Sequence, residues 1–317
     1  MIRLSTGARL VEVERNGVVE SVHTGHVVVL AADGSVRLSL GDPGQIVFAR
    51  SSLKPLQATG LLAAGARLEP AELALATASH SGSPLHRRLI AEMLANAGLT
   101  EQDLECPAAL PLGVEEQQAY LRAGDAPRRL AMNCSGKHAG MLITCLANNW
   151  PVSGYLAREH PLQQQLAATV AELAGEPVAA TAVDGCGAPL FGLSLIGVAR
   201  AFARIATGSV ALTAGQPVAE AMRAFPELVG GPGRAATVLM QRIGGLIAKD
   251  GAEGGFAAAL PDGGAVAVKI DDGAARAADI AVARALSQLG VEVGELATAP
   301  VLGGDEPVGL IRPADGW

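Results

Sequence analysis

Hydrophobic and polar residues alternate over the first 50 positions of the chain, and a period of two predicts β-strands. Ala32-Asp33-Gly34 links two of these segments and is typical of a hairpin turn. We therefore expect the chain to open with antiparallel strands. The predicted strands are residues 10–14, 18–22, 26–30 and 36–40.

From Ser51 onward the apolar residues recur at the spacing of a helix. In the first helical segment Leu53, Leu56 and Leu61 share one face. An alternating run at residues 265–270 then predicts a strand, and an Ala-rich helix is expected at residues 274–289. Strands at both ends therefore bracket a helical middle. Further helices are predicted at residues 69–78, 84–97, 137–149, 161–173, 189–205 and 218–224.

This order of elements predicts an α+β sandwich: a mainly antiparallel sheet built from N- and C-terminal strands, flanked by helices, with a helical lobe beside it. We expect a single domain over residues 1–317, with its sheet drawn from about residues 1–50 and 255–317 and its lobe within about residues 51–250. The strand–helix alternation and the Gly-rich dinucleotide motif of a Rossmann fold are both missing from the sequence.

Composition narrows the classes of partner. The 317 residues carry 31 acidic and 24 basic side chains, and only 3% are aromatic, so a nucleic-acid partner is disfavoured. The mean hydropathy of +0.32 is high, but no apolar stretch reaches the roughly 20 residues of a membrane span. The first residues also lack the apolar core of a signal peptide, so a cytoplasmic protein without a membrane partner is expected.

The most informative short segment is Arg50-Ser51-Ser52-Leu53-Lys54, at a transition from strand to helix. A Ser and a Lys three positions apart lie on one helix face, with Cβ atoms about 5–6 Å apart. Lysine can deprotonate a serine hydroxyl when burial or a cation such as Arg50 lowers its pKa. Serine β-lactamases and penicillin-binding proteins use this Ser-x-x-Lys pattern. The alternative is a helix-capping serine beside a solvated lysine.

Further polar clusters lie next to apolar helices. Ser79-His80-Ser81-Gly82 follows one predicted helix, Asn133-Cys134-Ser135-Gly136-Lys137-His138 opens another, and Asp184-Gly185-Cys186-Gly187 precedes a third. Such groups before a helix suit anion or metal binding. Neither Cys134 nor Cys186 belongs to a C-x-x-C pair, so their spacing alone does not indicate zinc. The other two cysteines, Cys106 and Cys145, are expected to be structural.

Taken together and in order, these motifs resemble the type II L-asparaginase family of the Rhizobium type (class 3). The resemblance covers nearly the whole chain. The segments that carry it are Thr24-Gly25-His26, Leu40-Gly41-Asp42-Pro43, residues 50–57, 78–82, 133–141, 160–163 and 184–189, Pro226-Glu227-Leu228-Val229, and Lys269-Ile270-Asp271-Asp272-Gly273.

The resemblance implies a fold similar to serine β-lactamases and glutaminases, and the hydrolysis of L-asparagine to L-aspartate and ammonia. It implies two catalytic pairs, Ser51 with Lys54 and Ser79 with Lys249. It also implies a homodimer and a zinc ion that tunes substrate binding. The implied zinc ligands are Cys134, Lys137 and Cys186.

Chemistry and resemblance together predict that Ser51 attacks the side-chain amide and that Lys54 takes its proton. Ser79 and Lys249 would relay protons or hold the tetrahedral intermediate. Asp184 is the candidate partner for the substrate ammonium. For the substrate carboxylate the candidates are Arg50 and the helix start around Lys137 and His138.

Two alternatives remain at this point. The chain could be a glutaminase or another serine acyl-transfer hydrolase of the same fold, although the Ser-Asp-Asn and Lys-Thr-Gly motifs of β-lactam acyltransferases are missing. It could also be a non-catalytic amino-acid-binding protein, in which two Ser–Lys pairs would have no purpose. Release of ammonia distinguishes these classes.

Overall fold

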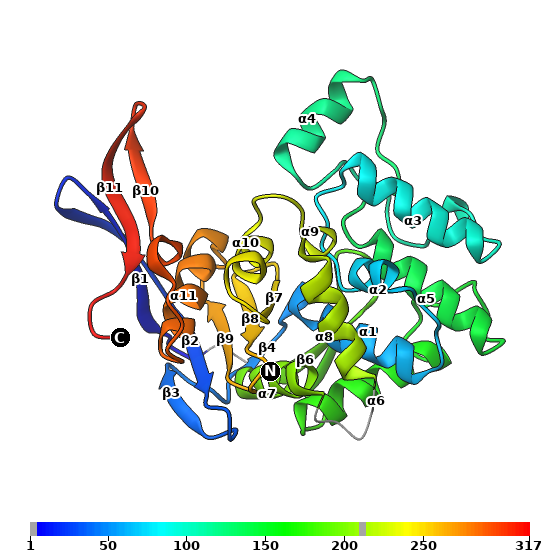
Figure 1. Cartoon of the computed structure of the whole chain (residues 1–317), viewed down its shortest axis with the longest axis horizontal. Helices are drawn as coiled ribbons and strands as arrows, with labels where there is room; N and C mark the ends of the chain where they lie inside the picture. Colours follow the sequence, from blue (N-terminus) through cyan, green and yellow to red (C-terminus); the bar gives the residue numbers. More distant parts are fainter. Residues whose placement is uncertain (1–4, 209–213) are drawn as a thin grey trace.

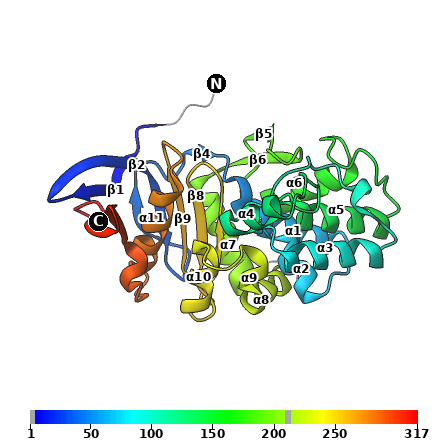
Figure 2. The same ribbon diagram turned by 90° about the horizontal axis from the view of Figure 1, so that it is seen from above.

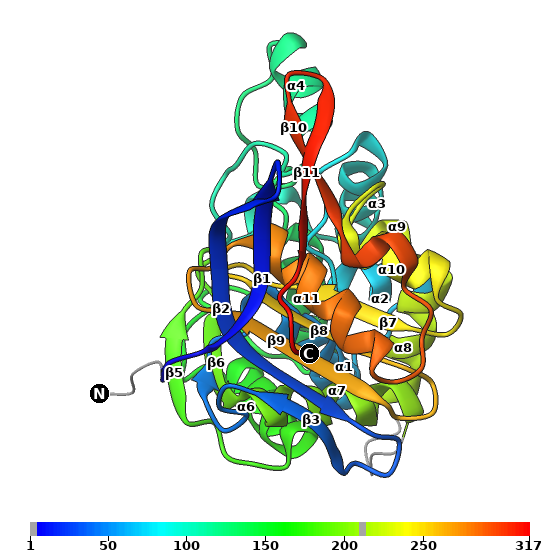
Figure 3. The same ribbon diagram turned by 90° about the vertical axis from the view of Figure 1, so that its left-hand side faces the viewer.

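A large antiparallel sheet forms one side of the molecule (Figure 1, Figure 3). The computed structural model describes residues 5–208 and 214–317. Within them the strand order is β10-β11-β1-β2-β9-β8-β7, and β3 also pairs with β2. The expectation that N- and C-terminal strands share one antiparallel sheet is confirmed. The strands are β1 (Ala8–Arg15), β2 (Val18–Leu30), β3 (Val36–Leu40), β7 (Ile247–Asp250), β8 (Gly255–Ala259), β9 (Ala265–Ile270), β10 (Ala299–Gly303) and β11 (Glu306–Pro313).

Strand β2 is continuous over 13 residues, so the prediction of two separate strands at 18–22 and 26–30 is wrong. Thr24-Gly25 reads as a break in the sequence. In the sheet, however, a Cβ atom on Gly25 would lie only 2.2 Å from the carbonyl oxygen of Lys269 on β9. Glycine is therefore required here for close strand approach and does not end the strand.

Two helices enclose the centre of the sheet between them. Helices α7 (Leu195–Thr207) and α11 (Ala275–Ser287) both pack on β8 and β9, from opposite sides (Figure 2). Every residue of β8 and β9 is consequently buried. Strands covered on both faces show no apolar–polar alternation, which explains why β8 escaped prediction.

The remaining helices form a lobe on the other side of the molecule, as the sequence predicts (Figure 1). A 3-10 turn, η1 (Arg50–Leu53), leads into this lobe. None of the helices in residues 5–208 and 214–317 has the length and apolar character needed to cross a membrane. The lobe helices are α1 (Lys54–Ala63), α2 (Pro70–Ala76), α3 (Pro84–Asn96), α4 (Val114–Arg122), α5 (Ser135–Ala147), α6 (Pro161–Ala174), α8 (Gly215–Ala224), α9 (Pro226–Val229) and α10 (Ala235–Arg242).

A small second sheet has the order β4-β6-β5, with β4 (Ile46–Val47), β5 (Ala180–Val183) and β6 (Pro189–Ser194). The predicted helix at 189–205 is therefore wrong over its first six residues, which form β6. The helix begins only after Ser194, whose hydroxyl accepts a hydrogen bond from the Gly197 N–H at 3.0 Å. Serine at this position is an N-cap signal, and β6 is an apolar strand buried along its length.

Candidate active site

The turn η1 and the start of α1 carry the Ser-x-x-Lys segment. Lys54 is the first residue of α1, followed by Pro55, which suits a first helical turn because its missing N–H would be unpaired there. Arg50 has a left-handed backbone, with φ of 53°, a conformation that costs a non-glycine residue about 1–3 kcal/mol. Its side chain is held by Asp184, with 2.7 Å between Nε and Oδ1. The strained turn thus directs Arg50 toward the β5–β6 hairpin.

Lys54 lies at the centre of the site and is only 1% exposed. Its Nζ is 2.9 Å from Ser79 Oγ, 2.5 Å from the Ala78 carbonyl oxygen and 3.0 Å from Cys134 Sγ. The partly exposed Ser51 makes no side-chain hydrogen bond within the described part of the chain. The lysine therefore contacts the second predicted serine, which lies 25 positions away in sequence.

Backbone hydrogen bonds hold Ser79 in this place. Its N–H donates to the Val229 carbonyl at the end of α9, at 3.0 Å. The next residue, His80, donates its N–H to the Asn133 carbonyl just before α5, at 3.1 Å. The segment after α2 is thus fixed between two lobe elements, and the predicted position of Ser79 just beyond a helix end is confirmed.

Lys249 approaches from the sheet, on β7. It is fully buried, and its Nζ donates to Asp250 Oδ1 at 2.7 Å. Asp250 also pairs with Arg234. Burial lowers the pKa of Lys249 to about 8, and the charge of Lys54 acts in the same direction. A hydrogen bond of 2.9 Å from Ser52 Oγ to the Lys249 carbonyl ties η1 to β7, so the sheet and the lobe meet at the site.

Two thiols and an amine form a buried cluster next to Lys54. Cys134 caps α5, Lys137 lies in its first turn, and Cys186 lies in the β5–β6 turn; all three are less than 5% exposed. The Lys137 Nζ is 3.2 Å from Cys186 Sγ. A hydrogen bond from Cys134 and the charge of Lys137 lower the pKa of Cys186, while the same thiol pair raises the pKa of Cys134. Cys186 is thus the thiolate of the pair.

This cluster fits a zinc ion by its chemistry, because zinc prefers sulfur and nitrogen donors in a closed, buried site. The described residues contain no group of three or more His, Cys, Asp and Glu side chains that could hold a metal. A metal here therefore needs the Lys137 amine as its third protein ligand. Burial opposes the charge on Lys137, but the neighbouring thiolate outweighs it and raises the pKa of the amine. Metal binding would have to displace that proton.

His138, a candidate for the substrate carboxylate, is completely buried. Its Nδ1 lies 2.7 Å from Tyr155 Oη, and its ring interacts with Cys186. The predicted residue therefore joins the thiol cluster, next to Lys137.

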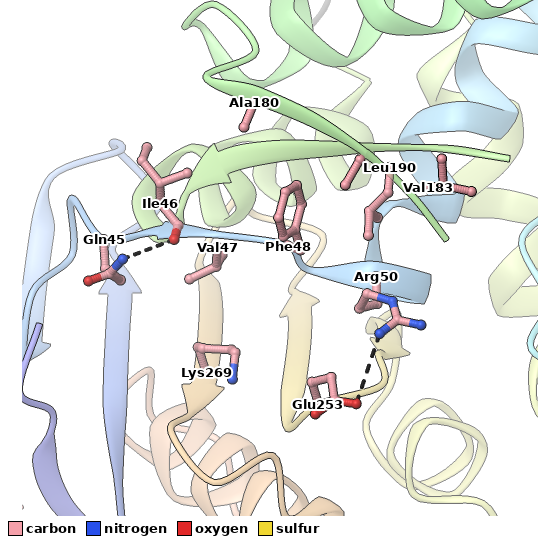
Figure 4. A pocket seen from close by; sticks show the side chains of 11 residues that line it. Gln45, Ile46, Val47, Phe48, Arg50, Ala180, Val183, Leu190, Glu253 and Lys269 are labelled. Carbon is pink, nitrogen blue, oxygen red and sulfur yellow. Dashed lines mark hydrogen bonds and ion pairs between the residues drawn. The ribbon is translucent and has the colours of Figure 1, made fainter. Parts of the chain in front are cut away.

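A cavity of about 660 Å³ opens beside Arg50 (Figure 4). Its walls are mostly apolar, from β4, β5 and β6, and include Phe48 and Leu190. Lys269 and Glu253 close it from the main sheet, and Glu253 lies 4.0 Å from Arg50. Of the predicted site residues, Arg50 alone lines it.

Several site residues were missed by sequence reasoning, namely Asp250, Arg234, Tyr155 and Lys269. One signal would have found Lys269. The chain has only four lysines, and every one is less than a tenth exposed. Because arginine supplies the other basic positions, a lysine in this sequence marks a buried amine.

The fold and site define a class of protein: an α+β molecule with a buried lysine hydrogen-bonded to a serine, beside an arginine–aspartate pair and a thiol cluster. The family model for L-asparaginase II matches residues 11–313. No curated protein matches the chain. The chain therefore belongs to the L-asparaginase II family, and the family predicted from its motifs is confirmed.

Proposed function

We propose that the protein is an L-asparaginase that hydrolyses L-asparagine to L-aspartate and ammonia with a Ser–Lys system. Membership of the L-asparaginase II family supports the substrate. One observation carries the chemistry: the buried Lys54 amine lies 2.9 Å from a serine hydroxyl and one helical turn from another. We also propose a fold of the serine β-lactamase type, supported by a Ser-x-x-Lys segment that begins a lobe helix against an antiparallel sheet.

Ser51 is the proposed nucleophile, because it is partly exposed whereas Ser79 is 3% exposed. Its Oγ attacks the side-chain amide carbon as its proton passes to the neutral Lys54 amine. The ammonium formed has three N–H donors. They match the three acceptors around Nζ, which are the Ala78 carbonyl, Ser79 Oγ and Cys134 Sγ.

The leaving group takes that proton from Lys54 and departs as ammonia, which leaves a β-aspartyl ester on Ser51. Water then attacks the ester carbon and gives a proton to Lys54. The lysine returns the proton to Ser51 Oγ as aspartate leaves. Lys249, half neutral near pH 8, lies close enough to lower the proton affinity of Lys54 by charge repulsion.

Substrate recognition falls to the Arg50–Asp184 pair. Arginine binds a carboxylate through parallel N–H donors, and an aspartate binds an ammonium. The pair is about a quarter and a tenth exposed, so it is reachable yet partly shielded from water, which strengthens both contacts.

We further propose that Cys134, Lys137 and Cys186 hold a zinc ion, supported by their burial and by the 3.2 Å between Lys137 and Cys186. When bound, zinc would supply a fixed positive charge that helps to orient the substrate.

The test is ammonia release from L-asparagine and, separately, L-glutamine, with the wild type and with Ser51→Ala and Ser79→Ala. We expect asparagine turnover, a loss of several orders of magnitude in Ser51→Ala, and trapping of an aspartyl group on Ser51. Near-normal kcat in Ser51→Ala with trapping on Ser79 would transfer the nucleophile to Ser79. Faster release from glutamine would support the glutaminase alternative.

A further inference from the structure

A buried hydrogen-bonded chain runs from the backbone of Glu105 through Tyr155 to His138. The Tyr155 side chain is fully buried, and its Oη accepts the Glu105 N–H at 2.9 Å. The same Oη lies 2.7 Å from His138 Nδ1. No substrate contact places either residue in the proposed chemistry, so their function needs another explanation.

The positions of the hydrogens follow from counting donors. The Glu105 N–H can only donate, so the phenol oxygen accepts there and keeps its own hydrogen to give. Within the described residues, the acceptor in reach of that hydrogen is His138 Nδ1. Were Nδ1 protonated instead, a buried O–H would be left without an acceptor, at a cost of roughly 1–3 kcal/mol. His138 therefore carries its single ring proton on Nε2.

That Nε2–H has one notable neighbour. Nε2 is buried without a hydrogen bond of regular geometry, yet the ring interacts with the sulfur of Cys186. Cys186 also receives the Lys137 ammonium at 3.2 Å. The sulfur thus lies among donors on α5, and the identity of the atom that His138 turns toward it depends on Tyr155.

We propose that Tyr155 is a positioning residue: by donating to His138 Nδ1 it fixes the Nε2–H tautomer, and that N–H holds the Cys186 sulfur in place next to Cys134 and Lys137. The tautomer and the sulfur contact stand independently of the reaction. Only the expected effect on zinc affinity rests on the proposed function, since partners that orient metal ligands typically contribute 10–100-fold to affinity.

The first experiment measures the ring nitrogens of His138 by NMR of metal-free protein labelled with ¹⁵N-histidine, assigned with His138→Gln. The wild type should show an unprotonated Nδ1 and a protonated Nε2. A protonated Nδ1 in the wild type overturns the proposal without the need for any further variant.

The second experiment uses a matched pair of variants. Tyr155→Phe removes the donor, whereas Tyr120→Phe removes an equally buried phenol hydroxyl that donates to the Ala126 carbonyl. We expect Tyr155→Phe to populate the Nδ1–H tautomer, to weaken Zn²⁺ binding by about 10–100-fold in chelator competition, and to weaken the thiolate charge-transfer band of the Co²⁺ form. Tyr120→Phe should retain wild-type values.

Equal tautomer populations and equal Zn²⁺ affinity in the two variants would overturn the positioning role. Failure of the proposed function looks different: the wild type would release no ammonia from either amide, while the NMR result and the difference between the two variants would remain.

Discussion

Lys249 gives the sharpest quantitative prediction, because it is a fully buried amine whose charge the fold opposes. Replacing it by methionine keeps a long unbranched side chain of similar volume and removes the charge. Asp250 retains its pairing with Arg234 in the variant. The comparison of wild type with Lys249→Met therefore isolates the ionisation of one amine.

The magnitude follows from the two pKa values. Burial lowers the pKa of Lys249 from 10.5 to about 8, and each pH unit is worth about 1.4 kcal/mol, so the charged form is penalised by roughly 3 kcal/mol. Because the native pKa is the lower one, the native state binds fewer protons than the unfolded state between these values, and stability rises with pH. The full penalty acts below about pH 8 and fades as the pH approaches about 10.5.

The assay is denaturant unfolding of both proteins at a series of pH values. From about pH 7.5 to about pH 9.5, linkage predicts that the wild type gains about 2 kcal/mol of unfolding free energy relative to Lys249→Met. Asp279, whose pKa burial and Asp250 raise to about 7, is largely ionised over this range in both proteins. A difference that stays constant within about 0.5 kcal/mol would refute the argument that burial drives Lys249 toward its neutral form.

Three further predictions test other parts of the structure. Asp184→Asn should raise KM for asparagine strongly while leaving the fold intact, because it removes the partner of Arg50; an unchanged KM rejects that role. Gly251→Ala should lower Tm and turnover together, since its Cβ would lie 2.3 Å from the Ala49 carbonyl beside η1; a variant as stable as the wild type contradicts this close approach. An amine-specific reagent should leave the four lysines unmodified in the native protein and modify all of them in denaturant, as read by peptide mass mapping, because none is more than 8% exposed; labelling of the native protein would contradict their burial.

Much of the sheet was predictable because its strands show their faces in the sequence. The run at 265–270 coincides with β9, and the hairpin around Asp33 joins β2 to β3 as expected. Prediction failed where both faces of a strand are covered. β6 is an uninterrupted apolar run that cannot be told from a buried helix by its spacing, and only pairing with β4 and β5 makes it a strand.

The candidate site divides in the same way. The Ser51–Lys54 spacing is a local property of one helical turn, so the sequence was enough to suggest it. Lys54 also meets Ser79 and Cys134, which are 25 and 80 positions away along the chain. Motif order brought these residues to attention, but nothing in their spacing indicates that one amine touches both.

The sequence by itself determined the antiparallel opening, the helical middle, the family and the residue types of the site, because each depends on local periodicity or on short motifs. Only the tertiary structure decided which side chains share hydrogen bonds: Lys54 with Ser79, Lys249 with Asp250, and Tyr155 with His138. The physical reason is that buried polar groups must find partners wherever packing places them, and packing joins segments that are remote in the chain.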